Sequence, residues 1–186
     1  MLRDPGFSLL QQARARLAQG GVLAYPTESC FGLGCHPGSA LGLRRILALK
    51  RRPMHKGMIV VGANWAQLQP YVMRLSAEQQ AQLSHYWPGP VTLLLPASRR
   101  ALPLLRGRHR KLAVRISAHP ETARLCQLLG SALVSTSANL AGQRALKTAR
   151  ACRRTFGDAA LAMPGRIGAR RKPSTIIDFA TGRVLR

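Results

Sequence analysis

The stretch Ala132-Leu133-Val134-Ser135-Thr136-Ser137-Ala138-Asn139 changes character halfway along its length. Its apolar first half predicts a buried strand over 132–135, and three hydroxyls and an amide follow where that strand ends. In α/β domains, ligands bind at the ends of strands, which favours a binding site here. A serine or Asx turn that caps a helix explains the same polar residues equally well.

Strand and helix patterns alternate on both sides of this stretch, although not in a strict repeat. Strands are predicted at 22–25, 58–61, 91–95, 112–116, 175–179 and 184–185. Helices are predicted at 9–18, 40–49, 120–129 and 148–155, with Ser8 and Ser39 as caps of the first two and Asn64 and Ser76 as caps of two short ones. We therefore expect α/β architecture: one domain over 1–186, with a mixed sheet flanked by helices.

The charge balance is strongly basic, with 29 Lys and Arg against 6 Asp and Glu and a net charge of +23. Such a chain favours polyanionic partners, such as nucleotides or nucleic acid, although compositional drift toward arginine is the alternative. Six scattered acids do not supply the paired carboxylates of a glycosidase or the cluster of a two-metal nuclease. No metal site is predicted, and any Mg²⁺ would be held mainly by phosphates of a ligand.

Two groups of cations suit an anionic ligand. Lys50, Arg51, Arg52 and Lys56 surround Pro53, which ends a helix, so they are predicted to lie on the following loop. They would clamp a triphosphate or merely offset the helix dipole. Lys111 and Arg115 share one face of a predicted strand, where a scarcity of acids favours a bound anion.

Residues 25–34 combine hydroxyls with Gly32 and Gly34 in a predicted loop whose amides could face an anion. The segment is neither a P-loop nor a dinucleotide fingerprint, and a tight structural turn is the favoured local interpretation. The chain shows no secretory signal and no apolar run of membrane-span length. Its four cysteines form no CxxC pair, so free thiols in a reduced, cytoplasmic protein are expected.

Seven short motifs occur in order along nearly the whole chain. They are YPTE at 25–28, FGLGC at 31–35, LKRRP at 49–53, WPGPVT at 87–92, AVR at 113–115, STSAN at 135–139 and PSTIID at 173–178. Together they resemble the YrdC/TsaC family of threonylcarbamoyl-AMP synthases in its single-domain form. The resemblance implies a YrdC-like (RibB-like) twisted α/β sheet with a large basic cavity.

The resemblance also implies an activity. Members of the family condense L-threonine, bicarbonate and ATP into threonylcarbamoyl-adenylate and pyrophosphate, a nucleotidyl transfer. A threonylcarbamoyl-transfer complex then modifies tRNA beside the anticodon. ATP would thus be a substrate, and tRNA or another RNA an expected partner.

Carried over motif by motif, the resemblance assigns roles to twelve positions. The catalytic set would be Lys50, Arg52, Ser137 and Asn139. The ATP-binding set would be Lys50, Arg52, Lys56, Lys111, Ser135, Asn139 and Arg186. The threonine-binding set would be Thr27, Ser29, Arg115, Ser137 and Ser174, with Arg115 on the threonine carboxylate. Catalysis would rest on positioning and charge stabilisation, since no nucleophile with its base is recognisable.

The chain departs from longer members of the family in two ways. The second domain that many carry is not part of this sequence, and Val61 stands where a histidine often follows the Lys-x-Arg motif. Two other functions remain as alternatives. One is a non-catalytic RNA-binding assembly factor, in which the Arg-rich segments 99–110 and 144–154 follow a phosphate backbone. The other is carbamoyl transfer as in hydrogenase-maturation proteins, which carry additional zinc-finger modules that this sequence lacks.

Overall fold

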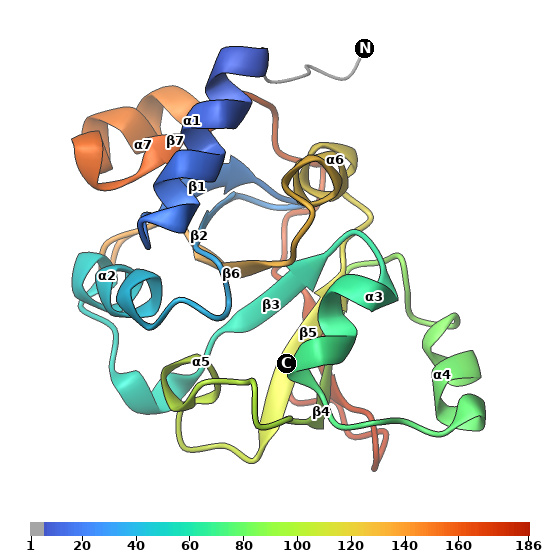
Figure 1. Ribbon diagram of the computed structural model, residues 1–186. Helices are drawn as coiled ribbons and strands as arrows, with labels where there is room; N and C mark the ends of the chain where they lie inside the picture. Colours follow the sequence, from blue (N-terminus) through green and yellow to red (C-terminus); the bar gives the residue numbers. More distant parts are fainter. Residues whose placement is uncertain (1–5) are drawn as a thin grey trace.

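The computed structural model describes residues 6–186, and its elements interleave along the chain (Figure 1). The helices are α1 Phe7–Ala18, α2 Ala40–Lys50, α3 Trp65–Leu68, α4 Ala77–Leu83, α5 Pro103–Arg106, α6 Pro120–Leu129 and α7 Ala149–Phe156. Short 3-10 turns are η1 Met54–Lys56, η2 Gln69–Tyr71 and η3 Gly157–Ala159. The strands are β1 Leu23–Pro26, β2 Phe31–Gly34, β3 Ile59–Gly62, β4 Val91–Pro96, β5 Lys111–Ile116, β6 Leu133–Ser137, β7 Leu161–Ala162 and β8 Thr175–Asp178.

The eight strands form one sheet in the order β7-β1-β2-β6-β3-β5-β4-β8. The sheet is mixed: β1 pairs with β7 in parallel and with β2 in antiparallel orientation, and β3 pairs with β5 in parallel. The expected mixed α/β architecture is confirmed. No helix among residues 6–186 is long and apolar enough to span a bilayer.

Strand alternation sorts the core onto two faces of the sheet. Leu133 and Val61 point to one face, where they pack with side chains of α1 and α6. Val134 and Val60 point to the other face, into a larger cluster that includes residues of α2 and α5. Both faces are therefore covered, but α1 and α6 cover only part of theirs.

The uncovered part of that face carries a row of residues in register across five strands. Ser135 pairs with Ile59, Ile59 with Ala113, Ala113 with Leu94, and Leu94 with Asp178. The row brings positions that are far apart in the sequence onto one surface. It forms the floor of a large cavity.

Most predicted caps are confirmed. The Ser39 hydroxyl accepts a hydrogen bond from Gly42 N at 3.1 Å, and Asn64 and Ser76 cap α3 and α4 in the same way. The prediction that Ser8 caps the first helix was wrong. α1 begins at Phe7 after Gly6, which makes no side-chain capping bond. The final predicted strand, 184–185, makes only an isolated bridge between Val184 and Ile177.

The predicted loop over 31–34 was wrong, because these residues form β2 in the interior of the sheet. Glycine is needed there for close approach rather than for a turn. A Cβ at Gly34 would overlap the carbonyl oxygen of Val134 and come within 2.7 Å of the Tyr25 ring. The hydroxyl-bearing loop is thereby shortened to residues 27–30, between β1 and β2.

Candidate functional site

A cavity of about 1170 Å³ lies over the row of residues that forms its floor. It is lined by eleven cationic side chains and by one acidic side chain, that of Asp178. The cations are Arg52, Lys56, Arg106, Arg108, Arg110, Lys111, Arg115, Arg144, Lys147, Arg171 and Arg186. The composition of this wall strongly favours an anionic ligand with several negative charges.

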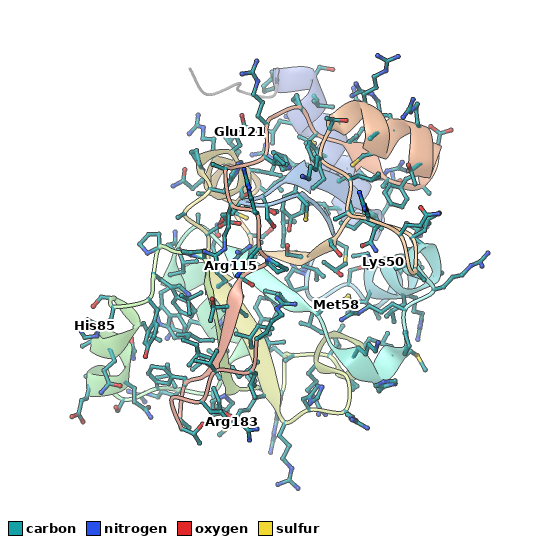
Figure 2. All side chains as sticks on the ribbon, turned by 180° about the vertical axis from the view of Figure 1, so that it is seen from behind. Lys50, Met58, His85, Arg115, Glu121 and Arg183 are labelled. Atoms are coloured by element: carbon teal, nitrogen blue, oxygen red, sulfur yellow. The ribbon has the colours of Figure 1, made fainter. Side chains whose placement is uncertain are left out.

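Eleven of the twelve positions singled out in the sequence line this one cavity. They come from the β1–β2 loop, the segment from the end of α2 through η1, β5, β6 with the residues after it, and the C-terminal segment. They are Thr27, Ser29, Arg52, Lys56, Lys111, Arg115, Ser135, Ser137, Asn139, Ser174 and Arg186. Lys50 is the exception, since it lies behind the wall. In Figure 2, Lys50, Met58 and Arg115 lie toward the middle of the molecule, and His85, Glu121 and Arg183 lie toward its outside.

Arg115 has a carboxylate partner within the protein. Its guanidinium Nη2 lies 3.1 Å from Glu28 Oε2, and Ser117 Oγ donates to the other oxygen, Oε1, at 2.7 Å. Both ion-pair side chains are largely buried, at 7% and 13% exposure. We expected the scarcity of acids to favour a bound anion at Arg115. The structure shows instead that Glu28 is its partner. Glu28 holds one edge of the guanidinium while the residue still faces the cavity.

Arg52 is held by the backbone of the loop that follows it. Nη2 donates to the carbonyl oxygens of Lys56 at 3.2 Å and Gly57 at 2.9 Å, and Nε is buried without a partner. Burial, and then the charge of Arg186, lower the pKa of Arg52 from its usual value. An anion between these two arginines would offset that repulsion and supply the missing acceptor.

The far wall of the cavity is formed by β5, β8 and the C-terminal residues. Lys111 pairs with Asp178 at 2.6 Å, which holds the pKa of that carboxyl below its usual range. The Arg186 side chain donates to the carbonyl oxygen of Ser174, whose buried hydroxyl accepts from Thr92 at 2.9 Å. Lys111 therefore reaches the cavity as one member of an ion pair, not as a free cation.

Lys50 is the last residue of α2 and is only 6% exposed. Arg51 follows in the left-handed conformation with φ 47°, and Arg52 N donates back to Leu47 O, so the chain turns sharply after Lys50. The Lys50 ammonium donates to Ser137 O at 2.5 Å and to Asn139 O and Oδ1 at 3.1 and 2.9 Å. Burial, and secondarily Arg52, lower the pKa of Lys50 to about 8, so the ammonium still predominates at neutral pH.

The cations that sequence reasoning missed lie on the Arg-rich connections. Arg106, Arg108 and Arg110 stand between β4 and β5, and Arg144, Lys147 and Arg171 lie on the other loops of the wall. The segments 99–110 and 144–154 were recognised as Arg-rich but were considered only as an RNA-binding surface. The sheet order, which brings β5 between β3 and β4, places the β4–β5 connection beside the cavity, and the three-dimensional fold brings the other loops to the same wall. Val61, by contrast, is fully buried in the core beside α1 and α6.

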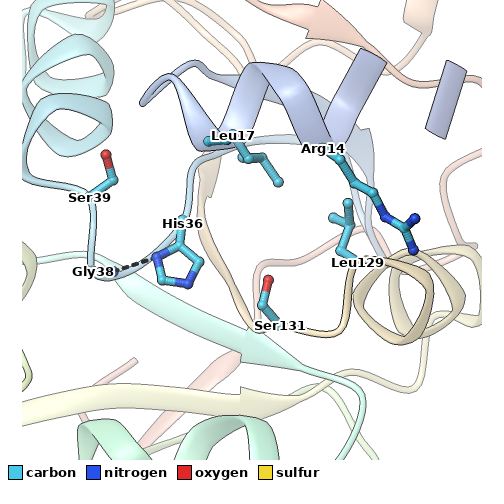
Figure 3. Close-up of a pocket in the computed structure, with 8 residues that line it drawn as sticks. Arg14, Leu17, His36, Gly38, Ser39, Leu129 and Ser131 are labelled. Carbon is cyan, nitrogen blue, oxygen red and sulfur yellow. Dashed lines mark hydrogen bonds between the residues drawn. The ribbon is translucent and has the colours of Figure 1, made fainter. Parts of the chain in front are cut away.

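A second cavity, of about 390 Å³, lies between α1, the segment before α2 and the end of α6 (Figure 3). Its lining includes Arg14, His36, Ser39 and Ser131. Arg14 already donates to Leu128 O at 2.6 Å, and burial lowers the pKa of His36, which favours the neutral ring. This cavity lacks the concentration of cations that a polyphosphate needs, and none of the predicted site residues lines it.

Metal ligands are scarce in the part of the chain that the structure describes. No three His, Cys, Asp or Glu side chains gather there in an arrangement that would hold a metal ion. The one carboxylate of the large cavity, Asp178, is engaged by Lys111. A Mg²⁺ ion held by the protein itself would need free carboxylate oxygens, and the paired Asp178 carboxylate does not fit that requirement.

Comparison with known proteins gives consistent matches over nearly the whole chain. The Sua5/YciO/YrdC family model, described as telomere recombination, matches residues 15–186. The threonylcarbamoyl-AMP synthase of Chromobacterium violaceum is 63% identical over 184 residues, covering 99% of this chain and 95% of that protein. The protein of the same name from Laribacter hongkongensis is 65% identical over 174 residues, covering 94% of each.

Solved structures agree on the architecture. P. abyssi Sua5, complexed with L-threonine, superposes with a TM-score of 0.83 at 27% identity over 95% of this chain, which spans 53% of that longer protein. E. coli YciO superposes with a TM-score of 0.83 at 24% identity, and the match covers 100% of this chain and 91% of YciO. At this identity, the match to YciO supports the fold alone.

Proposed function

Because the chain belongs to the Sua5/YciO/YrdC family, we propose that it is a threonylcarbamoyl-AMP synthase. It condenses L-threonine, bicarbonate and ATP into threonylcarbamoyl-adenylate and pyrophosphate, which makes it a nucleotidyltransferase. The observation that carries the proposal is the single cavity in which eleven of the twelve predicted residues meet among cations. Its charge suits a triphosphate, and its hydroxyls suit a small polar amino acid.

The proposed reaction has two bond-forming steps. The amine of threonine takes up bicarbonate with loss of water, giving a carbamate. A carbamate oxygen then attacks the α-phosphorus of ATP as the bond from that phosphorus to the bridging oxygen of pyrophosphate breaks. No covalent enzyme intermediate is required, so the protein contributes alignment of the two substrates and stabilisation of the developing charge.

Each wall of the cavity suits one substrate. Arg115, fixed by Glu28, offers its remaining donors to the threonine carboxylate, beside Thr27, Ser29 and Ser174. Arg52, Lys56 and Arg186 suit the phosphates, and the unpartnered Nε of Arg52 is a donor in need of an acceptor. Ser135 and Lys111 complete the nucleotide side in this proposal.

The reaction also suggests its partners. We propose that Mg²⁺ is held by the phosphates of ATP and that the adenylate is consumed by a complex that transfers the threonylcarbamoyl group to tRNA. Transfer of this kind belongs to the cytoplasm. The net charge of +23 is compatible with tRNA close to the surface of the enzyme.

Pyrophosphate release by the purified chain tests the proposed function. With ATP, bicarbonate and L-threonine together, release is expected, and omission of any one of the three should abolish it. Arg52→Ala should lower kcat by about a hundredfold, since it removes a charge that stabilises the transition state. Arg99→Ala is the matched control, because Arg99 is exposed and outside the cavity lining.

Two results would contradict the proposal. Release that continues without threonine would indicate a simple ATP pyrophosphatase. A folded chain that binds ATP and RNA but releases no pyrophosphate under any combination would favour the RNA-binding alternative.

A further inference from the structure

The Lys50 ammonium has no donor left for a ligand. An ammonium carries three N–H groups, and Lys50 has three acceptors, namely the carbonyl oxygens of Ser137 and Asn139 and the Asn139 side-chain oxygen. The residue is also absent from the lining of the cavity. In this arrangement Lys50 binds the strand end of β6 and does not reach a phosphate.

The Asn139 side chain is saturated in the same way. Oδ1 accepts from Lys50 Nζ at 2.9 Å and from Ser137 Oγ at 2.6 Å, and Nδ2 donates to the carbonyl oxygens of Leu140 at 2.9 Å and Gln143 at 3.0 Å. This network fixes the orientation of the amide. The flipped amide would place N–H groups against an ammonium and its oxygen against two carbonyl oxygens.

The consequence falls on Ser137, which is exposed and lines the cavity. Asn139 Oδ1 carries no hydrogen, so the hydroxyl proton of Ser137 must lie between the two oxygens. What Ser137 then presents to the cavity is a lone pair, which accepts a hydrogen bond and cannot donate one. A fully ionised phosphate oxygen, itself an acceptor only, is therefore the wrong group to meet it.

We propose that Lys50 and Asn139 are positioning residues that fix Ser137 as a hydrogen-bond acceptor for an N–H or O–H group of the amino-acid substrate. The proposal rests on the proposed function for the identity of that substrate. It removes Lys50 and the Asn139 side chain from the set of groups that contact ATP. It also divides the cavity into a donor-rich side, around Arg52, and an acceptor at the end of β6.

Equilibrium binding of L-threonine and of α,β-methylene ATP, without turnover, tests this assignment. Ser137→Ala and Lys50→Met should each weaken threonine binding by about tenfold, the value of one well-made hydrogen bond. Neither should change the affinity for the ATP analogue by more than about twofold. Arg52→Ala, the matched cation on the cavity wall, should show the reverse pattern.

The double variant gives the sharpest result. If Lys50 acts through Ser137, then Lys50→Met combined with Ser137→Ala should bind threonine no more weakly than Ser137→Ala alone. Additive losses, or a loss of ATP-analogue affinity in Lys50→Met comparable to that in Arg52→Ala, would overturn the proposal. Should Lys50→Met fail to fold, Ser137→Ala decides alone: weakened ATP-analogue binding with unchanged threonine binding would overturn it.

L-2-aminobutyrate, which lacks the hydroxyl of threonine, identifies the donor. If the hydroxyl meets Ser137, then wild type should prefer threonine by about tenfold and Ser137→Ala should lose that preference. If the nitrogen meets Ser137, the variant should weaken both ligands equally. A chain that binds both substrates but releases no pyrophosphate would overturn the proposed function alone, and one that binds no threonine would overturn both proposals.

Discussion

At the scale of single residues, the few acidic side chains hold the basic cavity in shape. Glu28 holds Arg115, Asp178 holds Lys111, and Glu121 Oε2 accepts from the backbone N of Arg166 at 2.9 Å on the loop beside the cavity. Two of the six acids in the chain therefore pair directly with cations of the cavity wall, and a third holds the backbone of an adjoining loop. A basic wall of this density needs such internal partners, because neighbouring cations repel one another.

Glu28→Gln should be strongly destabilising. It leaves the largely buried Arg115 without its counter-ion while keeping the size of the side chain and an acceptor for Ser117. Breaking one half of a buried pair costs about 3–5 kcal/mol, and access of water from the cavity should keep the loss near the lower value. Urea denaturation measures it, with Glu78→Gln on the exposed first turn of α4 as the control, where less than ~1 kcal/mol is expected. Equal losses in the two variants would show that the ion pair adds nothing.

The sequence predicted which residues gather at the cavity better than it predicted their contacts. Arg115, Ser137 and Arg52 were placed from motif resemblance, and all three line the cavity. The pairing of Arg115 with Glu28, and the withdrawal of Lys50 behind β6, depend on contacts between segments far apart in the chain. Local patterns carry no information on such contacts.

At the scale of elements, capping residues set where the helices begin. Ser39 starts α2, and α2 in turn places Lys50 under the end of β6 eleven residues later. The spacing matters because the helix fixes both the height and the direction of its last side chain. A weakened start of α2 should therefore cost stability throughout the helix that supports Ser137 and Asn139.

Ser39→Ala should lower the free energy of unfolding by about 1 kcal/mol, because Gly42 N loses its acceptor. Ser8→Ala is the matched control. Its hydroxyl caps nothing and only accepts a long contact from Gln12 at 3.5 Å, so a change within about 0.5 kcal/mol is expected. Thermal or urea unfolding of the pair gives the comparison, and a loss in Ser8→Ala as large as that in Ser39→Ala would contradict the structural assignment of the caps.

The presence of a helix was predictable where hydrophobic periodicity and caps agreed, as for α2 and α6, and that of a strand where alternation was clear, as for β5. The prediction failed for β2, because Gly32 and Gly34 are typical of a turn but are required here for close packing of strands. It also failed for β7, whose two residues, Leu161 and Ala162, are too short for a pattern. Strand order was beyond local reasoning, since β3 and β6 are neighbours despite lying more than seventy residues apart in number.

At the scale of the whole molecule, a net charge of +23 acts on stability and on binding in opposite directions. Repulsion among like charges opposes folding, and the same charges attract an anionic ligand to the cavity. Salt screens both effects, with a Debye length near 10 Å at 0.1 M. Added salt should therefore stabilise the folded chain and weaken the binding of an anionic ligand.

Raising NaCl from about 0.05 to about 0.5 M should increase the unfolding temperature of the unliganded chain and weaken binding of α,β-methylene ATP several-fold. Differential scanning calorimetry and equilibrium binding measure the two quantities. Sodium fluoride serves as the control for specific chloride binding and should act in the same way as NaCl. An unfolding temperature that rises with sulfate or phosphate but not with either halide would indicate occupation of the cavity instead of general screening.

The register of the sheet also has a consequence for biosynthesis. The cavity floor is completed by β8, which pairs with β4 across a separation of more than eighty positions, and its wall includes Ser174 and Arg186. A ribosome-bound chain that has exposed everything up to β6 therefore already holds Thr27, Arg52 and Arg115 but lacks one side of the site. The cavity is therefore complete only after β8 has paired with β4, so a site built from every part of the chain forms late in folding.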